Sequence, residues 1–308
     1  MSALFAGVDA GGTHTRVLVT DDQGTELATA DGAGSAIQPG SASHSAAVIR
    51  DAVRRATVGH EQPLRGLCVG VAGAGRDEER DTLAAALEAD RVAGTVLVVT
   101  DAEIALEDAF GAGPGILLVA GTGSIAWGKG PTGVMGRCGG WGPVIGDEGS
   151  GAWIGRRALG VATASADGRE PETGLTTALI AATHAGSADG LIPWAAKATP
   201  ADLGNLAPAV LEVAAMGDLR ANSLVTLAVE ELALHVRTLA RQLFADERVA
   251  FRLALHGGLL ARGSLLRRRV EQRLKTMTPG AVLLGETVRP ERGAVKLAMR
   301  EAGLVRSA

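Results

Sequence analysis

A hydrophobic segment, a glycine-rich turn and a second hydrophobic segment occur twice in this chain, more than a hundred residues apart. The first copy spans residues 5–19 with Ala-Gly-Gly-Thr at its turn, and the second spans residues 117–127 with Gly-Thr-Gly-Ser. In each copy a polar turn and a third short segment follow. Two strands joined by a tight turn pair in antiparallel fashion. The repeat therefore predicts two domains built on one pattern, with a cleft between them.

The continuation of each glycine turn excludes a common alternative. A dinucleotide-binding unit runs from its glycine turn directly into a helix, with the spacing GxGxxG. Here residues 15–20 read as another strand, and a third is expected over residues 25–30. The first domain is therefore not a dinucleotide-binding fold.

Phosphate binding is one function of such a turn. Successive N–H groups form a concavity for anions, and glycines remove the Cβ atoms that would hold a phosphate away. Thr13 and Thr15 add hydroxyl groups, and Asp9 ends the first strand facing the same space. A carboxylate beside phosphates acts through Mg²⁺ or its waters. These residues alone equally allow an ordinary glycine-rich hairpin in which Asp9 caps the turn.

Composition narrows the class of protein. The 308 residues suffice for one large or two medium domains, and 46% of them are hydrophobic. The net charge of −4, with no basic cluster beyond residues 267–269, argues against a nucleic-acid partner. Cys68 and Cys138 form neither a disulfide framework nor a zinc site. No signal peptide or membrane span is recognised, so a cytoplasmic protein without a membrane partner is expected.

Asp101 stands out in the first half of the chain. It follows a buried strand expected over residues 96–100 and begins the next helix. Ligands of α/β sheets bind at the carboxyl ends of parallel strands. The simpler interpretation is a helix N-cap. A capping carboxylate has a fixed position, which a base for a sugar hydroxyl also needs, so the two roles are compatible.

The second half contains a glycine-rich loop over residues 136–151, expected to be neither helix nor strand. Asp147 and Glu148 precede a helix expected to begin near residue 152, which favours a ligand-binding loop on a rigid support. The alternative is a structural loop with Trp141 packed in a core. Further on, Asn222 or Ser223 is expected to cap a long helix, a strand ends in Gly257-Gly258, and a final helix is expected over residues 290–303.

Taken together, these motifs resemble the actin/hexokinase/Hsp70 ATPase superfamily, and within it the BadF/BadG/BcrA/BcrD ATPase family and the N-acetylglucosamine kinases. The resemblance rests on five motifs in the same order, namely residues 7–13, 100–102, 121–124, 139–150 and 257–258. It implies an α/β fold with two ribonuclease H-like (actin-like ATPase) domains. The N-terminal domain would comprise residues 1–112 plus a helix at about 290–308, and the C-terminal domain residues 113–289.

The resemblance also implies a function, which is ATP-dependent phosphorylation of N-acetylglucosamine or glucosamine at the 6-hydroxyl, with Mg²⁺, in a cytoplasmic homodimer. Asp101 would accept the proton of the sugar hydroxyl, and, as an N-capping carboxylate, it would be ionised at neutral pH. Asp9 would hold Mg²⁺ through water. The residues implied for ATP are Gly11, Gly12, Thr13, Gly121, Thr122 and Gly123 at the phosphates and Gly257 and Gly258 at the adenosine. Those implied for the sugar are Ser35, Asp101, Cys138, Gly140, Trp141 and Asp147.

Two departures from the family pattern concern the sugar. Residues 34–37 are Gly-Ser-Ala-Ile, where N-acetylglucosamine kinases of animals carry an asparagine, and Ala72 replaces a serine. Both leave open whether the sugar carries an acetamido group or a free amine. The alternatives are a kinase for another hexose, a sugar sensor, or an ATPase that activates a partner enzyme through an iron–sulfur cluster. That cluster needs thiolate ligands, and Cys68 and Cys138 provide no suitable pair.

Overall fold

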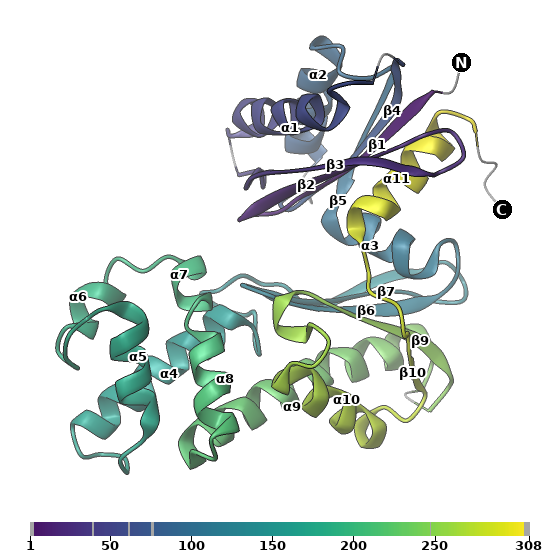
Figure 1. Ribbon diagram of the computed structural model, residues 1–308. Coiled ribbons are helices and arrows are strands. Elements are labelled where there is room, and N and C mark those ends of the chain that lie inside the picture. The colour runs from purple at the N-terminus through teal and green to yellow at the C-terminus, as the bar shows by residue number, and fades with distance from the viewer. Residues whose placement is uncertain (1–2, 39, 61, 75–76, 247, 305–308) are drawn as a thin grey trace. The chain divides into compact units, whose positions relative to one another are not determined.

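The computed structural model describes residues 3–38, 40–60, 62–74, 77–246 and 248–304. The chain divides into two compact units, Met1–Gly113 with Val288–Ala308, and Pro114–Thr287. Each unit contains one five-stranded sheet with helices packed against it (Figure 1). No helix among the described residues combines the length and the hydrophobicity that crossing a bilayer requires.

The sheet of the first unit has the strand order β3-β2-β1-β4-β5. Its strands are β1 (Leu4–Ala10), β2 (His14–Thr20), β3 (Glu26–Ala33), β4 (Leu64–Val71) and β5 (Thr95–Thr100). The first three are antiparallel neighbours, while β4 and β5 run parallel to β1. The predicted strand–turn–strand unit at the N-terminus is thus confirmed, with a third strand slightly longer than expected.

Two helices cover each face of this sheet (Figure 1). They are α1 (Ala42–Thr57) and α2 (Asp77–Ala89) on one face, and α3 (Asp101–Phe110) and α11 (Pro290–Glu301) on the other. Gly7 on β1 allows α11 to approach, because a Cβ there would lie 2.1 Å from the carbonyl oxygen of Glu291. Ser41 stands at the N-cap of α1, but its hydroxyl donates to the carbonyl of Gln38 and does not cap the helix.

A buried carboxylate fastens α11 to α3. The Asp108 side chain is 1% exposed and accepts hydrogen bonds from Arg292 Nε (2.6 Å), Arg292 Nη2 (3.0 Å) and the Arg289 N–H (2.8 Å). Burial alone would raise the pKa of Asp108, but these hydrogen bonds outweigh burial and hold the pKa below its usual range. The C-terminal helix is therefore an integral part of the first unit.

The second unit repeats the hairpin. Its sheet has the order β10-β9-β6-β7-β8, with β6–β7–β8 antiparallel and β9 parallel to β6. The strands are β6 (Gly115–Ala120), β7 (Ser124–Lys129), β8 (Met135–Gly139), β9 (Phe251–His256) and β10 (Ala281–Leu283). The helices are α4 (Gly151–Ala166), α5 (Gly174–Thr183), α6 (Leu191–Ala195), α7 (Pro200–Gly204), α8 (Ala207–Ala215), α9 (Leu219–Leu243), the 3₁₀ helix η1 (Gly258–Leu260) and α10 (Leu265–Met277).

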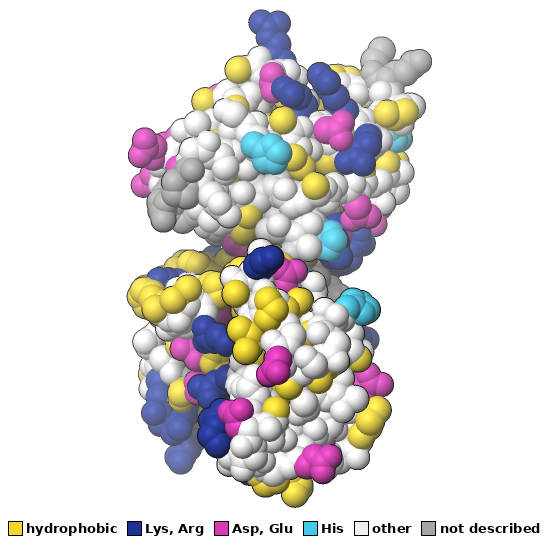
Figure 2. All heavy atoms as spheres, turned by 90° about the vertical axis from the view of Figure 1, so that its left-hand side faces the viewer, with side chains coloured by type: hydrophobic (Ala, Val, Ile, Leu, Met, Phe, Trp, Pro, Cys, Tyr) yellow, Lys and Arg dark blue, Asp and Glu magenta, His cyan; other side chains and the backbone are white. Residues whose placement is uncertain are grey.

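Two local expectations in the second unit are wrong. The long helix α9 begins at Leu219 and not near Asn222, because Asp218 caps it by accepting the N–H of Ala221 at 2.9 Å. The first residues of the expected glycine-rich loop form β8, because they continue the antiparallel pairing with β7. On the faces visible in Figure 2, Lys and Arg side chains are interspersed with Asp and Glu side chains.

Candidate active site

The glycine turn between β1 and β2 is held by hydrogen bonds on one side and is open on the other. The Gly11 N–H donates to His14 O (2.9 Å), and the Ser35 N–H donates to Gly11 O (3.0 Å). A Cβ at Gly34 would lie 2.1 Å from Gly12 O, so the segment after β3 packs directly against the turn. A Cβ at Gly12 would have no neighbour within 4 Å. The outer side of the turn is therefore free for a ligand.

The sugar-binding positions expected in this unit lie beside that turn. The Ile37 N–H donates to Ala72 O (2.8 Å). Residues 34–37 and Ala72, the two positions that depart from the family pattern, are therefore in contact. Ser35 is only 2% exposed, and its hydroxyl lies 2.6 Å from that of Thr15. Thr13 is exposed. A sugar contact by the Ser35 hydroxyl stays a prediction, since that hydroxyl already has a partner within the unit.

Asp101 is the first residue of α3, and the prediction that it is the N-cap is wrong. Thr100 caps the helix, with its hydroxyl accepting the Glu103 N–H (3.2 Å) while the Glu103 carboxylate accepts the Thr100 N–H (2.8 Å). This reciprocal capping box satisfies the helix end without Asp101. The Asp101 carboxylate accepts the neighbouring Ala102 N–H (3.0 Å), and the residue is exposed, so the carboxylate remains accessible.

The pKa values of Asp101 and Asp9 are both raised, and the charge of Asp101 contributes to the shift of Asp9. Desolvation by the surrounding protein raises the pKa of Asp101, which runs against the expected low pKa of a capping carboxylate. Asp101 has solvent-exposed surface, so crowding by protein atoms, and not full enclosure, causes this shift. Burial, followed by the charges of Asp101 and Glu291, raises the pKa of Asp9 to about 7. The predicted catalytic residue and the predicted Mg²⁺ residue thus lie close enough in the first unit for the charge of Asp101 to affect Asp9.

The residues around Asp9 fit a magnesium ion that is held mostly by other ligands. Among the residues described, no cluster of three or more His, Cys, Asp or Glu could bind a metal by itself. Mg²⁺ usually keeps several waters and takes one or two carboxylates together with substrate phosphates. The charges of Asp101 and Glu291 oppose the ionisation of Asp9, so a nearby cation would stabilise the ionised carboxylate.

Glu291 is a residue of this site that the sequence did not indicate. It is 8% exposed, and its Oε1 accepts a hydrogen bond from Arg289 Nε at 3.0 Å. Its Oε2 is buried without a hydrogen-bond partner among the described residues. An acidic residue in the first turn of a helix is an ordinary sequence pattern. Only the packing of α11 on β1 shows that this one affects Asp9.

In the second unit, the turn between β6 and β7 is tied to the start of α4. The Gly121 N–H donates to Gly123 O (2.9 Å), the Gly151 N–H to Gly121 O (2.8 Å), and the Ala152 N–H to Thr122 O (3.1 Å). Thr122 is exposed, and a Cβ at Gly121 would have no neighbour within 4 Å. This turn is rigidly supported on one side and open on the other.

Asp147 lies directly against this turn. It is 7% exposed, adopts a left-handed conformation (φ 55°), and its Oδ1 accepts the Gly142 N–H at 3.1 Å. A Cβ at position 123 would lie 2.7 Å from Asp147 Oδ2, so a larger residue there would displace the Asp147 carboxylate. Burial, followed by the charge of Glu148, raises the pKa of Asp147. Non-glycine residues in strained conformations often occur at functional sites, which agrees with the predicted role.

The other expected sugar residues differ in accessibility. Trp141 is 63% exposed, and the Arg137 guanidinium lies 4.5 Å from its ring centroid. Cys138 lies on β8 and not in the loop, is half-buried, and burial raises the pKa of its thiol. Gly140 has φ 70°, and a Cβ there would lie 2.3 Å from Ile125 Cδ1. Trp141 and Gly140 thus immediately follow β8, while Cys138 packs partly into the core of this unit.

The Gly257-Gly258 turn follows β9 at the same sheet edge as residues 121–123, because β9 pairs in parallel with β6. Gly257 has φ 96°, and a Cβ there would lie 2.4 Å from Ala120 O. A Cβ at Gly258 would have no neighbour within 4 Å. The missing side chains leave exposed backbone at this edge, on which a flat ring can lie.

Comparison with known proteins gives a consistent result. A sequence model of the BadF/BadG/BcrA/BcrD ATPase family matches residues 6–298. The N-acetyl-D-glucosamine kinase of Dictyostelium discoideum is 28% identical over 96% of this chain and 98% of its own. The N-acetylmuramic acid/N-acetylglucosamine kinase of Clostridium acetobutylicum is 34% identical over 58% of each chain. The crystal structure of a candidate N-acetylglucosamine kinase from Chromobacterium violaceum has a TM-score of 0.80 and 30% identity, covering 96% of this chain and 99% of that one.

Proposed function

This chain belongs to the BadF/BadG/BcrA/BcrD ATPase family, and on that premise we propose that it is an ATP-dependent amino-sugar kinase that phosphorylates N-acetylglucosamine or glucosamine at the 6-hydroxyl. Its fold is the two-domain α/β fold of the actin-like ATPases. Similarity to N-acetylglucosamine kinases over nearly the whole chain supports this activity. The observation that carries the proposal is the accessible Asp101 carboxylate beside Asp9, whose pKa is about 7.

In the proposed reaction, the Asp101 carboxylate accepts the proton of the sugar hydroxyl as that oxygen attacks the γ-phosphate of ATP. Its raised pKa makes it a stronger base than an ordinary aspartate. Because Thr100 performs the capping, the carboxylate is available for this role. Phosphoryl transfer depends mostly on positioning and charge neutralisation, so a weak base is sufficient.

Phosphate binding is assigned to the two glycine turns. Gly11, Gly12 and Thr13 in the first unit, and Gly121, Thr122 and Gly123 in the second, would donate backbone and hydroxyl groups to phosphate oxygens. Their open outer sides support this assignment. Asp9 would hold Mg²⁺ through water, and the bound ion would neutralise charge on the phosphates. Gly257 and Gly258 would carry the adenosine.

Sugar binding is assigned to Asp101 together with the loop residues of the second unit. Asp147 is fixed by the Gly142 N–H, and its Oδ2 would accept a hydrogen bond from a ring hydroxyl. We also assign sugar contacts to Trp141, Gly140 and Cys138, and to Ser35. The 2-substituent is not assigned, because residues 34–37 and Ala72 depart from the family pattern at this position.

The test is a coupled assay of ADP release with N-acetylglucosamine, glucosamine, glucose and N-acetylmannosamine. We expect turnover with N-acetylglucosamine or glucosamine and formation of the 6-phosphate, identified by NMR. Turnover only with glucose would refute the amino-sugar assignment, whereas turnover only with N-acetylmannosamine would change which amino sugar is the substrate. ATP turnover with none of the four sugars would refute the kinase proposal.

The principal alternative, an ATPase that activates a partner enzyme through an iron–sulfur cluster, is poorly supported. Cys68 is fully buried in β4, and burial raises the pKa of its thiol well above the usual range. A thiol that resists deprotonation is a poor cluster ligand. We also propose a cytoplasmic homodimer, as the family resemblance implies. Light scattering of the purified chain tests the dimer, and a monomer at working concentration would contradict it.

A further inference from the structure

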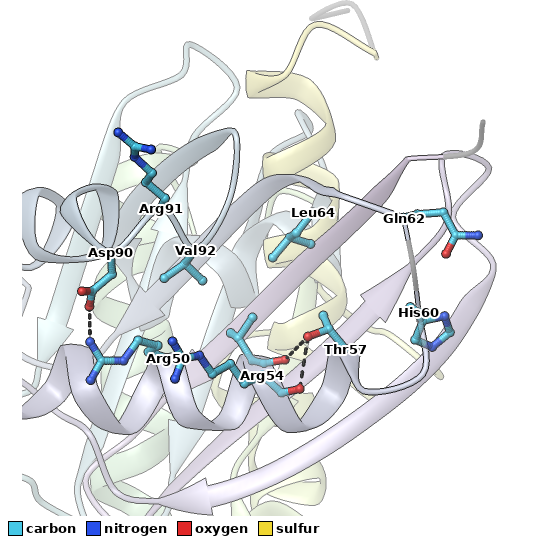
Figure 3. Close-up of a pocket in the computed structure, with 10 residues that line it drawn as sticks. Arg50, Arg54, Thr57, His60, Gln62, Leu64, Asp90, Arg91 and Val92 are labelled. Atoms are coloured by element: carbon cyan, nitrogen blue, oxygen red, sulfur yellow. Dashed lines mark hydrogen bonds and ion pairs between the residues drawn. The ribbon is translucent and has the colours of Figure 1, made fainter.

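The first unit has a second feature that the proposed kinase function does not use. A cavity of about 270 Å³ lies between the second half of α1, residues 90–92 after α2, and His60, Gln62 and Leu64 near the start of β4 (Figure 3). This cavity is at the amino ends of β4 and β5, whereas Asp101 follows the carboxyl end of β5. Six residues of strand span roughly 20 Å. The cavity is therefore separate from the candidate active site.

Positive charge dominates the lining of this cavity. Arg50, Arg54 and Arg91 line it together with a single carboxylate, that of Asp90. Arg50 and Asp90 form an ion pair, which Figure 3 shows at one end of the cavity. Within the described part of the chain, neither Arg54 nor Arg91 has an ion-pair partner. Two of the three positive charges are thus left without compensation.

The placement of Arg54 adds an unfavourable interaction. Arg50 and Arg54 are four residues apart on α1, and like charges at this spacing repel each other. The adjacent Arg55 does not share this situation, because it pairs with Asp51 at 3.2 Å. Thr57 donates its hydroxyl to Val53 O (3.0 Å) and Arg54 O (3.1 Å), so two carbonyls at the end of α1 are already satisfied (Figure 3).

Arg91 is unusual in its backbone conformation. It follows α2 with φ 50°, in the left-handed region where glycine or asparagine usually ends a helix. A residue with a long side chain is disfavoured there. Arg91 is one of the lining residues, and in Figure 3 its side chain points away from Arg50 and Arg54.

We propose that this cavity binds a small anion of the phosphate-monoester class. Guanidinium groups form forked, charge-assisted hydrogen bonds with phosphate oxygens. Val53, Leu64 and Val92 supply apolar surface, and Gln62 and His60 supply further polar groups at the other end. The volume suits a phosphoryl group with a small attached moiety, such as a hexose. Free phosphate and a sugar phosphate share this chemistry.

Calorimetric titration of the full chain with inorganic phosphate, glucose 6-phosphate and glucose tests the proposal without any turnover. We expect both phosphates to bind and glucose not to bind at this cavity. Arg54→Gln and Arg91→Gln should each weaken phosphate binding about tenfold, as loss of a charge-assisted hydrogen bond predicts. The matched control is Arg55→Gln, on the same helix but outside the cavity, which should leave the affinity unchanged. Tighter binding of glucose 6-phosphate than of phosphate would identify a sugar phosphate as the ligand, and equal binding would identify the phosphoryl group alone.

Two further variants keep the result interpretable. Arg91→Gly removes the guanidinium but relieves the left-handed strain, so it should weaken phosphate binding while maintaining or raising the melting temperature. Thr122→Ala changes one of the glycine turns and leaves the cavity unaltered. It should therefore not affect the phosphate binding that Arg54→Gln weakens. Equal affinities in the wild type, Arg54→Gln and Arg91→Gln would overturn the proposal. So would binding that is lost in Thr122→Ala alone, and failure of either phosphate to bind.

Discussion

Replacing Asp9 by asparagine should stabilise the folded protein while impairing its proposed activity. The pKa of Asp9 is raised from 3.8 to about 7, first by burial and then by the charges of Asp101 and Glu291. An acid with a raised folded pKa binds more protons in the folded than in the unfolded state. Stability is therefore highest below the unfolded pKa, falls as pH rises from 3.8 towards about 7, and is constant above that.

The magnitude follows from the size of the shift. At about 1.4 kcal/mol per pKa unit, ionised Asp9 destabilises the wild type by roughly 4 kcal/mol at pH 8 and roughly 1.5 kcal/mol at pH 5. Because Asp9 is only half-buried, solvent screens its charge, and we expect the destabilisation to be smaller than these values. The stability advantage of Asp9→Asn over the wild type should thus grow by about 2 kcal/mol between these two pH values.

Urea unfolding in the presence of a chelator, at about pH 5 and about pH 8, measures this difference. Asp31→Asn is the matched control, because Asp31 is an exposed carboxylate on the same sheet and should show no comparable pH dependence. Adding Mg²⁺ with ATP should stabilise the wild type more than Asp9→Asn. A stability difference between wild type and Asp9→Asn that does not change with pH would refute the reasoning.

Three further outcomes are expected. Asp101→Asn should lower kcat by roughly 10²- to 10⁴-fold while leaving the Kd for ATP within about threefold, measured by ADP release and by calorimetry; a near-normal kcat would remove Asp101 from the mechanism. Gly123→Ala should raise the KM for the sugar about tenfold, because the new Cβ would displace Asp147, whereas Gly160→Ala on α4, with open space around it, should not change KM. Asp108→Asn should lower the free energy of unfolding by about 2 kcal/mol at pH 7, measured with urea. Because the pKa of Asp108 is lowered, this loss should shrink as pH falls below about 4, and a constant loss would contradict the ion-pair explanation.

The repeated hairpin was predictable because its signal is local. The glycine turn, the flanking hydrophobic segments and the following polar turn are all contiguous, so the antiparallel pairing in both units could be expected from sequence. The helix starts were less accurate. Asp101 and Asn222 looked like N-caps, but Thr100 and Asp218 satisfy the helix ends. Neighbouring capping residues compete, and their geometry decides the outcome.

The electrostatics of the site could not be predicted, because they depend on residues distant in sequence. The effect of Glu291 on Asp9 requires α11 to pack on β1, which Gly7 permits. Likewise, the close contact between position 123 and Asp147 depends on where a later loop places that carboxylate. Sequence motifs therefore indicated the candidate site residues. The pKa values of these residues, and the contacts that position them, depend on tertiary packing.

The contribution of α11 to the first unit has a consequence for biosynthesis. Residues 114–287 form a contiguous unit, so they can complete their fold as soon as they leave the ribosome. The first unit cannot do so, because one face of its sheet is covered by residues 290–301, which are translated after the whole second unit. Until then Phe5, Leu18 and Cys68 lack part of their packing. The first unit therefore completes its hydrophobic packing only after the second unit has been synthesised.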